Sequence, residues 1–109
     1  MLENLAQRIE HTCLKPEASS EDIRNLCREA LENNFYGVCV AGAYVKTARE
    51  MLKNSAVKIV SVCGFPHGNM HPNAKRHEML TLLEEGAHEI DIVLNWGKLK
   101  DGKVAEVEN

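Results

Sequence analysis

The sequence predicts an α/β domain with a parallel sheet. Four apolar segments, at residues 9–14, 37–41, 57–63 and 89–95, alternate with segments whose apolar residues recur at helical spacing. Each gap between consecutive apolar segments is long enough for the crossover helix that parallel strands require. Strands of this apolar kind are buried by helices that pack against the sheet.

Local signals place the helices of the first half of the chain. Residues 2–8 carry apolar residues at helical spacing and predict a short leading helix. Ser19 begins the capping pattern Ser-Ser-Glu-Asp, and Asn33-Asn34 ends the amphipathic helix that follows. A second helix is predicted over residues 43–53. The residues expected to face inward from these two helices are Ile23, Leu26, Cys27, Ala30, Leu31, Val45, Ala48 and Leu52.

Proline and glycine mark the elements of the second half. The run Gly64-Phe65-Pro66 ends the third strand, and Pro72 suits the first turn of a third helix that stops at Gly86. Asp101-Gly102 predicts a turn, and residues 104–109 predict the first turns of a fourth helix. The residues expected to form the buried stripe of the third helix are Met79, Leu82 and Leu83.

Alternation along the strands assigns their side chains to two faces of the sheet. The face predicted to be small or polar carries Glu10, Thr12, Cys39, Ala41, Ser61, Cys63, Asp91, Val93 and Asn95. The face expected to pack against helices carries Ile9, Val38, Val40, Val60, Val62, Ile90, Ile92 and Leu94. An open doubly wound sheet needs apolar residues on both faces, whereas a barrel can place a polar face around a binding site. The alternation therefore favours a piece of a barrel.

Composition excludes several classes of function. The 109 residues are 44% hydrophobic and 27% charged, with a formal net charge of −3, which is typical of one globular domain. The absence of a basic run argues against nucleic acid as a partner. No apolar run reaches 18 residues and no signal peptide is recognisable, so we expect no membrane segment. Four separated cysteines without a Cys-x-x-Cys pair predict reduced thiols and a cytoplasmic protein.

Asp91 is the strongest candidate for site chemistry. It interrupts the apolar segment Glu89–Asn95, where a charge is costly unless it is paired or used. A buried aspartate that is paired with a neighbouring base is the structural alternative.

A zinc site is a competing interpretation of the third strand and its loop. Cys63, His67 and His71 follow one another at intervals of four, and Cys-His-His is a known ligand set. Gly64, Pro66 and Gly68 interrupt the segment, so the three side chains do not stack on a helix, and a fourth ligand is not evident. We therefore expect no metal.

Four motifs in order carry a resemblance to a known family. They are Ile9–Pro16, Val38–Val40, Gly64–Asn69 and Glu85–Asn95. Together they resemble deoxyribose-phosphate aldolase, a class I aldolase, over nearly the whole chain. The resemblance implies a TIM (β/α)₈ barrel, of which this chain would be the N-terminal half, a single domain over residues 1–109 that stops at the start of the fourth helix. It also implies reversible, cofactor-free cleavage of 2-deoxy-D-ribose 5-phosphate to glyceraldehyde 3-phosphate and acetaldehyde through a lysine Schiff base.

The resemblance assigns roles to five residues. Asp91 matches the catalytic aspartate that relays protons during imine formation and carbon–carbon cleavage. Glu10 and Thr12 match a polar pocket pair on the first strand, with Glu10 in place of the more usual aspartate. Cys39 matches a pocket cysteine, and His67 belongs to the loop at the pocket rim. From residue type alone, Thr12 is equally a strand former and Cys39 a small buried hydrophobe.

The family's imine lysine and phosphate loops belong to later strands, so the resemblance implies that this chain lacks them and is inactive, or nearly so, alone. Lys58 is assigned to the helix side at the wrong end of the sheet, and Pro16 keeps Lys15 in a loop. The lysines expected to be solvated are Lys46, Lys53, Lys75, Lys98, Lys100 and Lys103. The alternative is a non-catalytic half-barrel that binds a small phosphorylated or carbonyl ligand. It would form a homodimer, fourth strand against first, or take a partner that carries strands five to eight.

Overall fold

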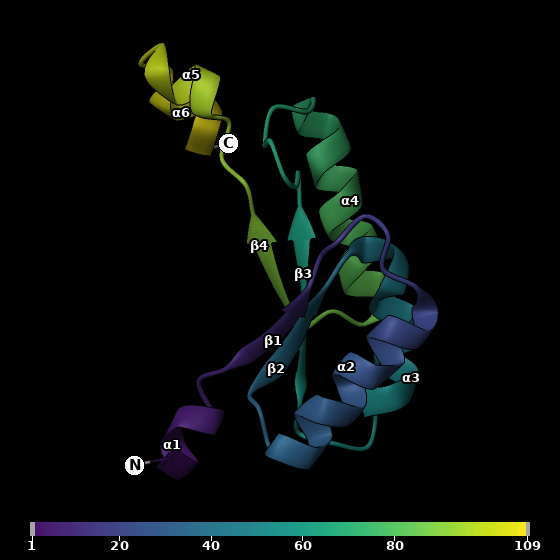
Figure 1. Ribbon diagram of the computed structural model, residues 1–109. Coiled ribbons are helices and arrows are strands. Elements are labelled where there is room, and N and C mark those ends of the chain that lie inside the picture. The colour runs from purple at the N-terminus through teal and green to yellow at the C-terminus, as the bar shows by residue number, and fades with distance from the viewer. Residues whose placement is uncertain (1, 109) are drawn as a thin grey trace.

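The computed structural model describes residues 2–108 as one parallel sheet with helices (Figure 1). In chain order the elements are α1 (Leu2–Ala6), β1 (Glu10–Cys13), α2 (Ser20–Asn33), β2 (Gly37–Val40), the 3₁₀ helix η1 (Gly42–Tyr44), α3 (Val45–Leu52), β3 (Lys58–Cys63), α4 (Pro72–Glu85), β4 (Glu89–Ile92), α5 (Trp96–Lys100) and α6 (Val104–Glu108). The four strands lie in the order β1-β2-β3-β4, and every neighbouring pair is parallel.

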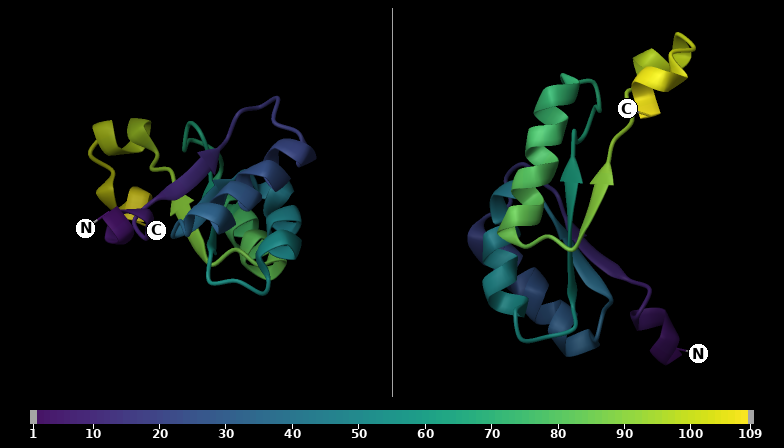
Figure 2. Two further views of the ribbon diagram at one scale, coloured as in Figure 1. Left: turned by 60° about the horizontal axis from the view of Figure 1, so that its bottom comes forward. Right: turned by 180° about the vertical axis from the view of Figure 1, so that it is seen from behind.

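Helices α2, α3 and α4 all cover the same face of the sheet (Figure 2). The core between the two layers consists of Ala18, Ile23, Leu26, Cys27, Ala30, Val38, Val40, Val45, Ala48, Leu52, Val57, Ile59, Leu82 and Ala87. A doubly wound sheet has helices on both faces, whereas strands in sequential order with one helical face are typical of a barrel. None of the helices described is long and apolar enough to cross a membrane.

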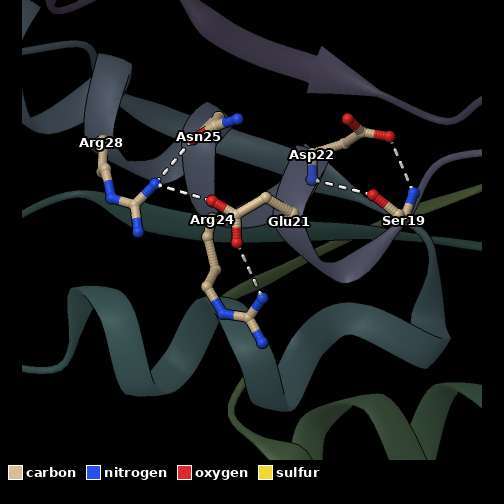
Figure 3. A network of polar contacts seen from close by, with 6 residues as sticks. All are labelled: Ser19, Glu21, Asp22, Arg24, Asn25 and Arg28. Carbon is tan, nitrogen blue, oxygen red and sulfur yellow. Dashed lines mark hydrogen bonds and ion pairs between the residues drawn. The ribbon is translucent and has the colours of Figure 1, made fainter.

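The capping pattern predicted for α2 is present (Figure 3). The Ser19 hydroxyl accepts the backbone N–H of Asp22 at 3.2 Å, and the Asp22 carboxylate accepts the backbone N–H of Ser19 at 2.9 Å. These bonds satisfy N–H groups that the first helical turn leaves without intrahelical partners. Further along the helix, Glu21 pairs with Arg24 and Arg28 at 3.3 and 3.2 Å. Since all three side chains are exposed, these ion pairs contribute little to stability.

The predicted helix ends are also correct. Asn34 and Gly86 both adopt the left-handed conformation, with φ of 54° and 113°, immediately after α2 and α4. In α4, however, only Leu82 is buried, and Leu83 is 48% exposed, so the predicted three-residue stripe is wrong at Leu83. Helix α4 packs at the β3–β4 edge of the sheet, and no other described element covers its outer side.

The second half departs from the predicted elements in two further places. Strand β4 ends at Ile92, three residues earlier than predicted, and the chain leaves the sheet after a last bond from the Val93 N–H to the Cys63 carbonyl. The short helix α5 was not predicted at all; Asn95 caps it by accepting the N–H of Lys98 at 3.1 Å. The helix predicted over residues 104–109 begins at Val104, and Asn109 lies outside the described residues.

Strand β3 presents the opposite faces from those predicted. Val60 lies beside Cys39, and Val62 lies beside Asp91, so both valines belong to the face that carries the candidate site. The alternate residues Ser61 and Cys63 belong to the helix side. By the same register Lys58 pairs with Gly37 at the N-terminal end of β3 and belongs to the face that carries the candidate site, not to the helix side as predicted. The prediction failed because every residue from Ile59 to Cys63 is buried, so polarity does not distinguish the faces.

Candidate active site

The face of the sheet opposite the helices brings together four of the five predicted site residues. Glu10 and Thr12 come from β1, Cys39 from β2 and Asp91 from β4. The register places Thr12 beside Cys39. Cys39 also belongs to a small apolar cluster on this face, together with Val60, Val62 and the partly buried Leu14. The local surface is therefore a mixed apolar and acidic floor, here called the site face.

Glu10 and Asp91 interact although they lie on the two edge strands. Three strand spacings of about 4.8 Å would separate the edges of a flat sheet by roughly 14 Å. Partial burial raises the pKa of Glu10, and the negative charges of Asp91 and Glu89 raise it further. The three carboxylates therefore influence one another through their charges. Such a group favours a proton or a cationic partner.

Asp91 is exposed, which corrects the expectation of a carboxylate on a buried strand. The cause is position: β4 is the last strand of the sheet, and its second half is covered by no other described element. Ile92, the next residue, is also exposed, at 51%. Asp91 is therefore a solvent-exposed carboxylate at the edge of the site face.

Cys39 and Thr12 have structural explanations on this face. Burial raises the pKa of the Cys39 thiol to about 11, with the charges of Asp91 and Glu10 adding to the effect. At neutral pH this sulfur is a thiol, and nucleophilic chemistry requires the thiolate. The Thr12 hydroxyl donates to the carbonyl of Glu10 at 2.9 Å. Both residues thus belong to the surface of the site face, and neither is prepared as a nucleophile.

The loop between β3 and α4 closes over the end of β4. Gly68 is buried with φ of 73°, and a Cβ at this position would lie 2.1 Å from the carbonyl oxygen of Leu94. The loop backbone therefore rests directly on the chain that leaves β4. His67, beside Gly68, is exposed. It belongs to the loop between β3 and α4 and not to the strands that form the site face.

Lys75 is held by the backbone, which corrects the expectation that it is solvated. Its Nζ donates to the carbonyl oxygen of Val93 at 2.8 Å, and the residue is half-buried. One helical turn later, Glu78 accepts the backbone N–H of Gly64 at 2.7 Å. The first two turns of α4 therefore contact the exits of both β3 and β4. Sequence patterns gave no signal for these contacts, because each joins a side chain to a distant backbone group.

A groove of about 850 Å³ lies beside the site face, between α4, the exit of β4 and the α5–α6 segment. Its lining residues are Cys63, Asn69, Met70, His71, Pro72, Lys75, Arg76, Met79, Ile92, Val93, Leu94, Asn95, Lys98, Glu106 and Val107. None of the five predicted site residues lines it. Successive strand residues point to opposite faces, so Ile92 in the groove and Asp91 on the site face are separated by β4.

The zinc ligand set considered from the sequence is not assembled. The thiol of Cys63 lies 3.1 Å from the carbonyl oxygen of Lys75, while the Nδ1 of His71 accepts the backbone N–H of Asn73 and caps α4. Within the part of the chain that the structure describes, no three His, Cys, Asp or Glu side chains are grouped as metal ligands.

Comparisons with known proteins agree with this geometry. The family described as DeoC/LacD family aldolase matches residues 6–108. A deoxyribose-phosphate aldolase of Thermotoga petrophila is 52% identical over 99 residues, which cover 91% of this chain and 40% of that protein. Another, from Bdellovibrio bacteriovorus, is 48% identical over 105 residues, covering 96% of this chain and 48% of that protein. The chain thus spans less than half the length of these relatives.

Solved structures show the same relationship. The structure named QR15, an aldolase, superimposes with a TM-score of 0.91 at 32% identity, over 95% of this chain and 46% of that one. The tetrameric deoxyribose phosphate aldolase of Aeropyrum pernix gives 0.82 at 39% identity, over 87% and 41%. These aldolases are TIM barrels, and the matched part corresponds to about half of the barrel, which confirms the predicted fold class. The chain belongs to the DeoC/LacD family of aldolases.

Proposed function

We propose that this chain supplies the Asp91-bearing half of a deoxyribose-phosphate aldolase site. The reaction is the reversible cleavage of 2-deoxy-D-ribose 5-phosphate to D-glyceraldehyde 3-phosphate and acetaldehyde through a lysine Schiff base. The observation that supports it most is the exposure of Asp91 on the site face, which also carries Glu10, Thr12 and Cys39 and where the charge of Asp91 acts on Glu10. The relatives named as this aldolase make the substrate class the natural choice.

Asp91 is the proton relay in this proposal. Forming an imine requires loss of water from a carbinolamine, and cleaving the carbon–carbon bond requires removal of a hydroxyl proton. An exposed carboxylate can pass protons in both steps through one ordered water. Glu10, the neighbouring acid whose pKa is raised, keeps a second proton site within electrostatic range. The chemistry needs an amine, a carbonyl and proton transfer, and no cofactor.

The imine lysine lies outside these 109 residues in this proposal. Lys58 belongs to the N-terminal end of β3, whereas barrel active sites lie at the C-terminal ends of the strands. The ammonium of Lys75 is engaged by the Val93 carbonyl. Lys15 belongs to the loop after β1 and lines a second groove on the helix side, with His11 and Cys13. A lysine on a later strand would approach the site face from its open side.

The decisive experiment grafts this chain onto the remainder of a relative. In a chimera, residues 6–108 replace the matching part of the Thermotoga petrophila aldolase, and cleavage of deoxyribose 5-phosphate is assayed. We expect turnover, with Asp91→Asn lowering kcat by about a hundredfold or more. Asp101→Asn, in the turn after α5, is the matched control and should leave kcat unchanged. Full activity of the Asp91→Asn chimera would refute the assigned role.

The 109-residue chain alone is tested by borohydride trapping with acetaldehyde, read by intact mass and peptide mapping. We expect neither a specific lysine adduct nor turnover. One labelled lysine together with turnover would show that the nucleophile is present after all.

A second candidate is a non-catalytic half-barrel that needs a partner for its edges. Ile92, Leu94 and Trp96 are exposed along the β4 side, which gives an apolar edge to cover. In a closed homodimer, however, the Glu10, Glu89 and Asp91 carboxylates of two copies would face one another. We therefore favour a complementing half that carries basic residues over self-pairing. A light-scattering mass decides: a stable dimer at pH 7 would support self-pairing, and a monomer would support the complementing half.

We place this activity in the cytoplasm, within nucleotide catabolism. All four cysteines are free, and three of them are buried, as expected where thiols stay reduced.

A further inference from the structure

The exit of β4 is held at one residue from two directions. The N–H of Val93 donates to the carbonyl of Cys63 at 3.0 Å, which extends the pairing with β3 by one bond. The carbonyl of Val93 accepts the Nζ of Lys75 at 2.8 Å. Val93 is therefore fixed to β3 through its donor and to α4 through its acceptor. Because the donor to that carbonyl is a cation, the bond is stronger than a neutral hydrogen bond.

The aliphatic part of Lys75 is itself held in place. A Cβ at Gly64 would lie 2.8 Å from the Cε of Lys75, so the lysine stem passes directly over Gly64. Glu78 accepts the Gly64 N–H at 2.7 Å, and the Cys63 thiol donates to the Lys75 carbonyl at 3.1 Å. Helix α4 is thereby tied to the exit of β3, and Lys75 spans from there to the exit of β4.

We infer that Lys75 is a positioning residue for Asp91. Strand β4 has four residues, lies at the edge of the sheet and carries Asp91 two residues before Val93, on the same side of the strand. Short edge strands open locally at low cost in free energy. The lysine bridge holds the end of this strand in register, and with it the direction of the Asp91 side chain. The catalytic consequence rests on the proposed function, but the positioning itself does not.

Amide hydrogen exchange separates local positioning from general stabilisation. Lys75→Met should speed exchange of the Val93 amide about tenfold, the equivalent of one lost charge-assisted bond. The amide of Val40, in the centre of the sheet, should be unaffected, and Lys75→Arg should restore most of the protection at Val93. Lys53→Met, at an exposed lysine after α3, is the matched control. Unchanged exchange at Val93, or equal acceleration at Val93 and Val40, would overturn the inference.

The coupling between Asp91 and Glu10 gives a second readout, measured by carbon NMR of the Glu10 carboxyl. Asp91→Asn should lower the pKa of Glu10 in the unmodified chain, because it removes one of the negative charges that raise it. In the Lys75→Met background, Asp91→Asn should lower the pKa of Glu10 by a smaller amount, since Asp91 is no longer held in place. The other nearby ionisable groups, Glu89, Tyr36 and Lys58, are the same in all four proteins. Equal coupling in both backgrounds would contradict positioning.

A third measurement needs no variant, and it decides the matter if Lys75→Met does not fold. In the unmodified chain the ammonium protons of Lys75 should exchange with water more slowly than those of Lys53. Equal rates would mean that the bridge is absent in solution. None of these readouts uses substrate, so failure of the proposed aldolase activity would leave them intact.

Discussion

The hydroxyl of Tyr36 donates a hydrogen bond to the carboxylate of Glu89, and so joins the residue before β2 to the start of β4 across β3. This bond is the largest cause of a raised pKa at Tyr36, followed by partial burial and by the charges of Glu89 and Glu10. It connects the acidic group of the site face to a strand two places away. Because each partner is an ordinary surface residue type, only the folded arrangement reveals the pair.

Titration of Tyr36 tests this bond. The chain has two tyrosines, so tyrosinate absorbance in a Tyr44→Phe background reports Tyr36 alone. We expect Tyr36 to ionise above its ordinary value, and Glu89→Gln to lower its pKa. A pKa that Glu89→Gln leaves unchanged would contradict the bond.

The same pair predicts a loss of stability in alkali. The folded-state pKa of Tyr36 lies above its unfolded value. The hydrogen bond to Glu89 therefore contributes fully to folding stability below about pH 10, and this contribution is lost as the pH rises through the folded pKa. We expect Tyr36→Phe to lower the urea midpoint at pH 7, and the difference from the parent to shrink above pH 10. A constant difference across this range would show that the hydroxyl contributes nothing through Glu89.

His88 predicts a loss of stability in weak acid. Its Nδ1 accepts the backbone N–H of Ile59 at 2.9 Å, and protonation would abolish this acceptor. Burial lowers the pKa of His88, and the charges of Lys58 and Arg49 lower it further. Since the folded pKa of His88 lies below its unfolded value, the contribution of His88 to folding stability is fully present above about pH 6.5. This contribution falls as the pH drops through the unfolded and then the folded pKa.

The test compares urea midpoints at pH 7.5 and 5.5. We expect the drop between them to be smaller in His88→Asn than in the parent. His77→Asn, an exposed histidine on α4, should keep the full drop and serves as the control. Equal drops in all three proteins would remove His88 as the cause.

Gly68 and Gly102 form a matched pair for the loop over β4. Both have a positive φ, 73° and 77°, but a Cβ at Gly68 meets the Leu94 carbonyl at 2.1 Å, whereas a Cβ at Gly102 meets nothing within 4 Å. Gly102→Ala should cost about 1 kcal/mol of unfolding free energy from backbone strain alone. Gly68→Ala should cost about 3 kcal/mol or more, because the loop must also move away from β4. Equal costs, measured by urea unfolding, would mean that the loop does not rest on the strand.

The cap of α2 gives a prediction for the helix layer. Ser19→Ala removes the side chain that accepts the Asp22 N–H and should lower stability by about 1 kcal/mol. Ser20→Ala changes the neighbouring exposed serine, which is the first residue of the helix, and should be nearly neutral. Urea unfolding of the two variants at pH 7 compares them directly. A larger loss of stability for Ser20→Ala than for Ser19→Ala would contradict the assignment of Ser19 as the cap.

The order of the four strands and of the helices that connect them, the cap of α2, the ends of α2 and α4, and the family were determined by the sequence itself. These features depend on neighbours within a few residues, as at Ser19, Asn34 and Gly86, or on residue identity, as in the run Gly64–Asn69. The alternation of side chains along β1, β2 and β4 placed Glu10, Thr12, Cys39 and Asp91 on one face, and the register of the sheet agrees with this.

Tertiary structure alone decided what depends on position within the sheet. The faces of β3 were settled by its pairing with β2 and β4, because every residue from Ile59 to Cys63 is buried and none marks a side. The exposure of Asp91 followed from the place of β4 at the edge, which an apolar segment does not reveal. The bond from Lys75 to Val93 joins residues 18 positions apart through a backbone carbonyl. Every residue has such a carbonyl, so only the packing of α4 against the strand exits selects the one that Lys75 binds.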